Sequence, residues 1–193
     1  TFTVDDGQGG RDTETITIVV RADEPDGLGV HVGHASGRPG ATAIAVEITV
    51  DAAAGIAGGD LTLHYQAAAL QATQVRAGEL ALSGGITVIG NTATPGEVKI
   101  SLAGALGLPA GSGTLVTLLF DINSEAVPGA YPLELTRAVL RNEQAQVIPL
   151  QPPVAGTFTV EDEVAVNRPP VLAAIGNQTV LEGASLQVIL SAS

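Results

Sequence analysis

The sequence predicts an all-β protein, a sandwich of about nine strands, and three observations lead to this fold class. The 193-residue chain contains 24 Gly and 11 Pro, which suit frequent chain reversals and suit long helices badly. Apolar residues alternate with polar ones in several segments, as expected of strands buried on one face. These segments recur at short spacing with turn residues between them, which is typical of a sandwich.

The alternation is clearest in residues 42–50, 61–65 and 98–102, where every second side chain is apolar. Residues 115–122 are apolar on nearly both faces, which predicts a central strand buried from both sides. Shorter strands are expected at residues 30–32, 70–75, 86–89, 133–135, 147–150 and 157–160.

The chain is predicted to have three parts, of which the central one, residues 25–164, holds all of these strands. Residues 1–24 end in a linker and begin with a hairpin, Phe2–Val4 and Thr13–Val20, around a Gly-rich tip. Residues 165–193 form a Pro-containing linker and then the opening strands of another domain. Neither end has enough strands to close a core of its own. We therefore expect a monomeric module within a longer multidomain chain.

Charge and composition exclude several classes of partner and site. The net charge is −12 and there are only eight Lys and Arg residues, so binding to nucleic acid or to an anionic membrane surface is not expected. The chain contains no run of about 18 apolar residues, so membrane insertion is not expected. The absence of Cys excludes disulfides and thiolate zinc sites.

Neither a metal site nor a catalytic site is predicted. A zinc site needs three or four converging ligands, and His31, His34 and His64 are expected to be separate surface residues. The acidic stretches at residues 5–7 and 161–163 lack EF-hand spacing, so we interpret them as a hairpin tip and a solvated linker. No Gly-x-Ser-x-Gly elbow and no facing pair of carboxylates is evident. We expect no enzyme activity and no cofactor in this chain.

Residues 27–160 resemble a cohesin domain, the scaffold module that captures dockerin domains in cellulosome-type assemblies. The resemblance rests on seven segments, which occur in the family's order: Val30-His31-Val32-Gly33, Gly37–Gly40 before the strand Ile44–Val50, the stretch from Gly55 through Gly58-Gly59-Asp60-Leu61 to Tyr65, Ala69-Leu70-Gln71-Ala72, Gly96–Leu102, Gly113–Phe120 and Gly156–Val160. It implies a jelly-roll sandwich and a non-catalytic function, the binding of a dockerin-containing protein. Calcium would then belong to the dockerin partner. The two ends resemble partial bacterial Ig-like or cadherin-like repeats.

The resemblance also implies which face binds the partner, namely the one built from the third, fifth, sixth and eighth strands of the family. Side-chain parity then gives the candidate partner-binding residues of this chain: Asp60, Thr62, His64, Thr87, Ile89, Glu97, Lys99, Ser101, Ala103, Glu134 and Thr136. Asp60 matches the family's acidic residue that hydrogen-bonds the dockerin helix. The sequence departs from the family at Ser101, Gly104 and Gly58, where an apolar, an acidic and a polar residue are usual.

Two alternative functions remain at this point. A carbohydrate-binding jelly roll is one, but sugar platforms use aromatic rings, and the chain has no Trp, two Tyr and three Phe. A structural spacer in a surface adhesin is the other, and the Ig-like ends favour it. All three functions imply a location outside the cell or on the bacterial cell surface, and the favoured one implies an assembly that degrades polysaccharide.

Overall fold

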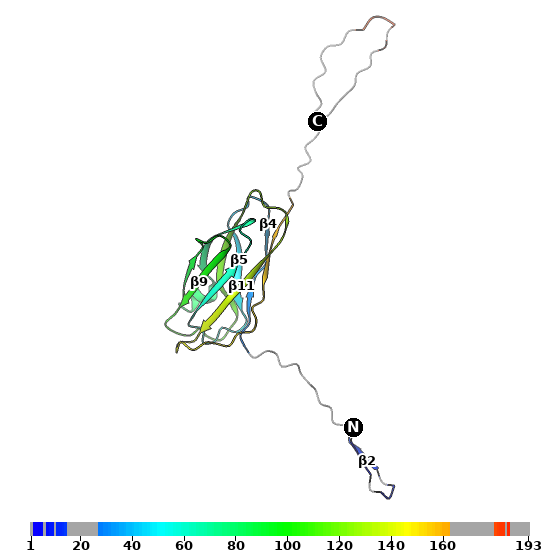
Figure 1. The fold of residues 1–193 in the computed structure, drawn as a ribbon, viewed down its shortest axis with the longest axis vertical. Coiled ribbons are helices and arrows are strands. Elements are labelled where there is room, and N and C mark those ends of the chain that lie inside the picture. Colours follow the sequence, from blue (N-terminus) through cyan, green and yellow to red (C-terminus); the bar gives the residue numbers. More distant parts are fainter. Residues whose placement is uncertain are drawn as a thin grey trace. The chain divides into compact units, whose positions relative to one another are not determined.

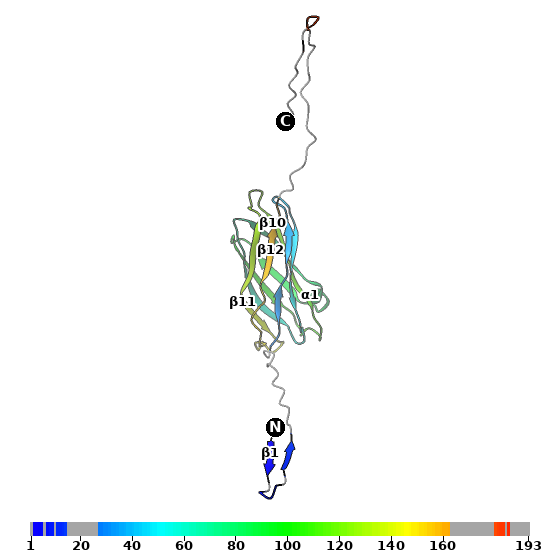
Figure 2. The same ribbon diagram turned by 90° about the vertical axis from the view of Figure 1, so that its right-hand side faces the viewer.

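The computed structural model describes residues 2–5, 7–9, 11–14, 27–162, 180–183 and 185. The chain divides into two units, residues 1–161 and 162–193. Within the first unit, residues 27–161 form a sandwich of two sheets with one short helix (Figures 1 and 2). The predicted all-β class is therefore confirmed.

Ten strands between residues 30 and 160 make up the two sheets of the sandwich. The four-stranded sheet has the order β3 (Val30–Val32), β5 (Ile44–Val50), β10 (Gly113–Ile122) and β7 (Leu70–Ala77). The six-stranded sheet has the order β4 (Ala35–Gly37), β12 (Gly156–Val160), β11 (Gly129–Arg141), β6 (Gly58–His64), β9 (Glu97–Ala103) and β8 (Thr87–Asn91). The helix α1 (Glu79–Ser83) follows β7. All neighbouring strands run antiparallel except β12 and β4, which are parallel.

The core lies between the sheets and is entirely apolar among the described residues. Its aromatic centre is a chain of edge-to-face contacts, with ring centroids 5.2 Å apart for Tyr65 and Phe120 and 6.0 Å apart for Phe120 and Phe158. Such pairs contribute beyond the burial of their area. The predicted inward positions of Tyr65 and Phe120 are confirmed, and the aromatic rings of this core are withdrawn from the surface.

The strand predictions are confirmed in most of the sandwich, and β10, predicted as central, lies between β5 and β7. Residues 147–150 are not a strand: Val147 and Leu150 make only isolated bridges, because Pro149 lacks the N–H that a continuous ladder needs. Two elements were not predicted, the three-residue edge strand β4 and the five-residue helix α1. Both are too short to show a period in sequence.

The predicted N-terminal hairpin is present, with β1 (Phe2–Asp5) antiparallel to β2 (Arg11–Glu14). Its tip contains Gly7 and Gly9 with φ of 73° and 94°, values that favour glycine. The second strand begins at Arg11, two residues before its predicted start. Residues 15–26 and most of the predicted C-terminal part lie outside the described residues, apart from Ser185 and a turn within residues 180–183.

Candidate functional site

The strand β6 lies inside the six-stranded sheet, with β9 on one side and β11 on the other. Its alternation turns Leu61 and Leu63 into the core and leaves the residues between them on the outside of the sandwich. The glycine before this alternation is required by packing. A Cβ added at Gly59 would clash with the carbonyl oxygen of Val139 on β11. The close approach of β11 therefore explains the glycine at this position.

All eleven candidate residues lie on four strands of this one sheet, β6, β8, β9 and β11. We call the solvent-facing side of these strands the outer face. Three candidates are half-buried, namely Asp60, Thr62 and Glu97. The other eight are exposed: His64, Thr87, Ile89, Lys99, Ser101, Ala103, Glu134 and Thr136. None is packed in the core, so the geometric condition for a binding face is met.

Asp60 lies at the centre of a cross-strand row on the outer face. Its direct neighbours in the sheet are Ser101 on β9 and Val139 on β11. The Ser101 hydroxyl donates a hydrogen bond of 3.1 Å to Oδ1 of Asp60. Beyond Ser101 lies Ile89 on the edge strand β8, with 67% of its side chain exposed. This row combines an oriented carboxylate with an exposed apolar side chain.

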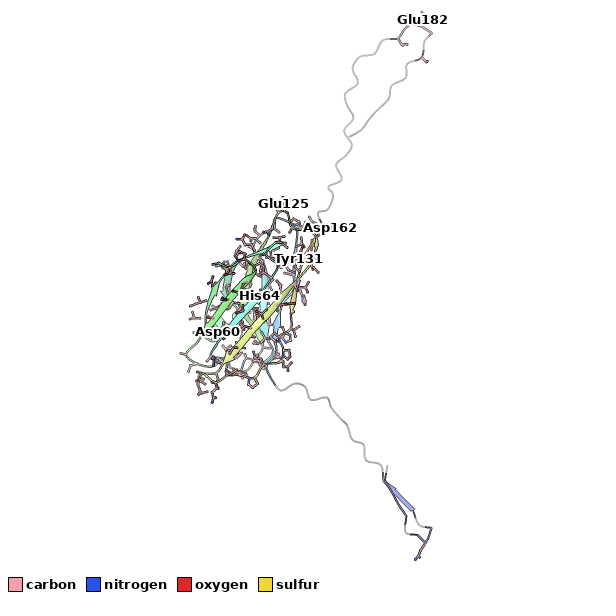
Figure 3. The ribbon with its side chains drawn as sticks, viewed as in Figure 1. Asp60, His64, Glu125, Tyr131, Asp162 and Glu182 are labelled. Carbon is pink, nitrogen blue, oxygen red and sulfur yellow. The ribbon has the colours of Figure 1, made fainter. Side chains whose placement is uncertain are left out.

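A second group of charges lies four residues further along β6, at His64 (Figure 3). Glu97 Oε2 is 3.2 Å from His64 Nε2, and Glu97 Oε1 is 3.1 Å from Lys99 Nζ. The hydrogen bond from Lys99, together with that from His64, holds the pKa of Glu97 below its usual value. Glu134 on β11 is directly opposite His64 in the sheet.

A β-bulge in β11 changes which residues reach the outer face. The register with β6 runs from Leu135, opposite Leu63, directly to Arg137, opposite Thr62, so Thr136 is an extra residue. The Thr136 hydroxyl donates to the carbonyl oxygen of Thr62. Parity through residue 136 would have turned Arg137 inward, but the bulge turns it outward.

Sequence reasoning therefore missed three residues of the outer face, Arg137, Val139 and Arg141, which follow Glu134 along β11. A signal for them existed in the spacing of the buried leucines. Leu133 and Leu140 are both inward but seven residues apart, which strict alternation does not allow.

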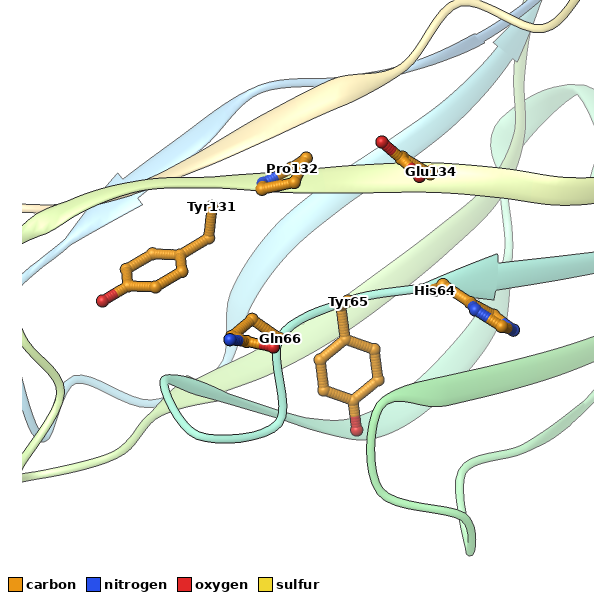
Figure 4. Close-up of a pocket in the computed structure, with 6 residues that line it drawn as sticks. All are labelled: His64, Tyr65, Gln66, Tyr131, Pro132 and Glu134. Carbon is orange, nitrogen blue, oxygen red and sulfur yellow. The ribbon is translucent and has the colours of Figure 1, made fainter.

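Three shallow hollows follow β6 along the outer face. The first is lined by the end of β6 and the start of β11, and Figure 4 shows its residues: His64, Tyr65, Gln66, Tyr131, Pro132 and Glu134. The middle one lies over Thr62, between Lys99 and Arg137. The third lies over Gly58 and Gly59 and extends to Gly104 and Arg141. Small residues at Gly58, Ser101 and Gly104, the positions that depart from the family, open this third hollow or border it.

In the parts of the chain that the structure describes, no group of three or more His, Asp or Glu side chains could hold a metal ion. His31 lies on β3 in the other sheet and His34 in the loop after it, apart from His64 on β6. In the same described parts, no helix is long and apolar enough to cross a membrane.

The comparisons with known proteins bear on residues 28–160, which match the family model "Cohesin domain". No curated protein sequence matches the chain. Among solved structures, the sixth cohesin of scaffoldin B from Acetivibrio cellulolyticus, in complex with a mutant Cel5 dockerin, is 19% identical with a TM-score of 0.62. The similarity covers 70% of this chain and 99% of that one.

Two further structures come from other organisms. The solution structure of CaCohA2 from Clostridium acetobutylicum is 24% identical with a TM-score of 0.60, over 70% of this chain and 91% of that one. A non-cellulosomal cohesin from the archaeon Archaeoglobus fulgidus is 18% identical with a TM-score of 0.61, over 70% and 92%. At these identities the structures establish a common fold.

Proposed function

The chain belongs to the cohesin family, and from this premise we propose that residues 28–160 are a non-catalytic module that binds a dockerin-bearing protein. The solved relatives support this partner, because the cohesin from Acetivibrio cellulolyticus was crystallised in complex with a dockerin. Calcium is then a component of the dockerin and not of this chain.

The observation that carries the proposal is the outer face, where the candidate residues form one continuous surface on paired strands. A partner that docks there meets side chains already held by the sheet. Little conformational entropy is therefore lost on this side of the interface. We propose that the eleven candidate residues contact the partner, with Asp60 as the central hydrogen-bonding group.

The setting of the module is also a proposal. We infer a monomeric module in a secreted or cell-surface multidomain protein, with the ends of this chain as parts of Ig-like neighbours. The hairpin of β1 and β2, which includes the alternating apolar and polar residues of Phe2–Val4, is compatible with such a neighbour. A polysaccharide-degrading assembly is the favoured context. The relative from Archaeoglobus fulgidus is a non-cellulosomal cohesin, so members of the family also occur outside cellulosomes.

A carbohydrate-binding function fits the described surface poorly. Tyr65, Phe120 and Phe158 are buried, and Tyr131 is half-buried with its hydroxyl bonded to the Val127 carbonyl. Sugar-stacking platforms need exposed rings, and these four provide no flat aromatic surface.

The test is a pull-down with the 193-residue chain immobilised and a panel of purified dockerin domains, including the Cel5 dockerin. At least one calcium-loaded dockerin should be retained, and chelation of calcium should release it. Gel retardation on soluble polysaccharides should show no shift. If no dockerin is retained, the proposal is contradicted. A shift on a polysaccharide would then favour the carbohydrate-binding alternative. A negative result in both assays would favour the structural spacer.

A further inference from the structure

The middle hollow of the outer face is built around Thr62, a short side chain between two long cationic ones. Thr62 is directly opposite Lys99 on β9 and directly opposite Arg137 on β11. Strands lie about 4.8 Å apart, so the Cα atoms of the two cationic residues are separated by about 10 Å. The cavity between them measures about 300 Å³, and Asp60 and Ser101 line its edge.

The two cationic side chains differ in whether they already have an ion-pair partner. Lys99 Nζ lies 3.1 Å from a carboxylate oxygen of Glu97. The side chain of Arg137, an exposed residue, has no hydrogen bond or ion pair with any residue that the structure describes. Its planar guanidinium carries five N–H donors, which match the two oxygens of a carboxylate in parallel.

The direction of Arg137 is set by the backbone. Thr136, the extra residue of the β11 bulge, turns the side chain of Arg137 out of the sandwich. Bulges commonly re-aim one side chain next to a functional site. The hydroxyl of Thr136 bonds to the carbonyl oxygen of Thr62, which ties the bulge to the floor of the hollow.

The charge distribution favours an acidic occupant at this point. Residues 28–160 contain nine Asp and Glu but only five Lys and Arg. Lys99, Arg137 and Arg141 lie on the outer face, whereas the other two basic residues, Arg38 and Arg76, lie outside it. The outer face also carries Asp60, Glu97 and Glu134, so its charges balance, whereas the rest of residues 28–160 has six acidic and two basic residues. An acidic side chain of a partner is therefore repelled less at Arg137 than elsewhere on the module, and complementary charge across an interface selects partners.

We propose that the hollow between Arg137 and Lys99 receives an Asp or Glu side chain of the dockerin, and that Arg137 selects partners that carry this carboxylate. The inference rests on the proposed function and adds the chemistry of the partner. It predicts that the dockerins bound by this chain have an acidic residue on their contact surface.

The experiment measures the affinity of a retained dockerin for the full chain and for three variants, Arg137→Gln, Arg137→Glu and Arg76→Gln. The control residue Arg76 is an exposed arginine on β7 of the other sheet. Arg137→Gln should weaken binding about tenfold to a hundredfold, the range for one lost charge-assisted bidentate contact. Arg137→Glu should weaken it further, and exchange of the partner's acidic residue for Lys should restore the affinity of this variant. Arg76→Gln should leave the affinity unchanged.

The outcomes separate the two proposals. If a dockerin binds and Asp60→Ala weakens it, but Arg137→Gln behaves like Arg76→Gln, the carboxylate inference is overturned while dockerin binding stands. If Arg137→Glu cannot be rescued by any acid-to-Lys exchange in the dockerin, the inference is likewise overturned. If no dockerin binds the unchanged chain, the proposed function fails and the inference fails with it.

Discussion

Replacement of Asp60 by Ala tests the centre of the outer face. The carboxylate is half-buried on an inner strand and its Oδ1 accepts a hydrogen bond of 3.1 Å from Ser101. This bond leaves the second carboxylate oxygen available to a partner. Loss of one hydrogen bond to a charged group at an interface costs about 1–3 kcal/mol, which corresponds to an increase in Kd of about fivefold to 150-fold.

The stability of the module should change little, because the bond between Ser101 and Asp60 is exposed and such substitutions lie within about 0.5 kcal/mol. Isothermal titration calorimetry with a retained dockerin measures the first effect, and urea denaturation measures the second. Glu125→Ala is a matched control, since Glu125 is an exposed acidic residue between β10 and β11 (Figure 3). Equal Kd values for the Asp60→Ala variant and the unchanged chain would refute the central role of this carboxylate.

Three further predictions concern the sandwich that holds the outer face. Gly59→Ala should lower the free energy of unfolding by about 1–3 kcal/mol in urea denaturation, since the new methyl group meets the Val139 carbonyl on the adjacent strand. Phe158→Ala should lower it by about 3–5 kcal/mol in the same measurement, because the ring is fully buried in the aromatic centre; retention of full stability would contradict the packing described above. The carboxyl of Glu97 should titrate below its usual pKa in NMR, and Lys99→Gln should bring it back up. Because the folded-state pKa is lowered, this pairing stabilises the fold above the usual pKa of a glutamate and ceases to do so as the pH falls through the lowered value.

Alternation was sufficient to predict the faces of β6 and β9. Leu61 and Leu63 are buried and Asp60 and His64 are not, as the period of two requires. Parity is a local property of a regular strand, so a sequence pattern can carry it. The same rule could not be extended along β11: the prediction ended at Leu135 and placed Glu134 and Thr136 outward, where both are exposed, but it did not reach Arg137.

The reason for this failure is that a bulge depends on the pairing between two strands that are far apart in sequence. Thr136 has no neighbour in β6, and its chemistry gives no sign of this. Arg137, which we propose as the selective residue, became visible only when the register with Thr62 was known. The edge strand β4 was missed for a related reason, since its three residues are held in the sheet only by pairing with β12.

The parallel pair β4 and β12 joins the two ends of the module. The stretch from Leu28 to Gly37 runs in the same direction as the stretch from Leu150 to Val160, through the bridges Leu28–Leu150 and His31–Val154 and then the β4–β12 ladder. Tension applied through the chain on both sides of the module would pull these two stretches in opposite directions along their length. Their hydrogen bonds would then be sheared together and not opened one after another, so the geometry opposes unravelling from either end under load.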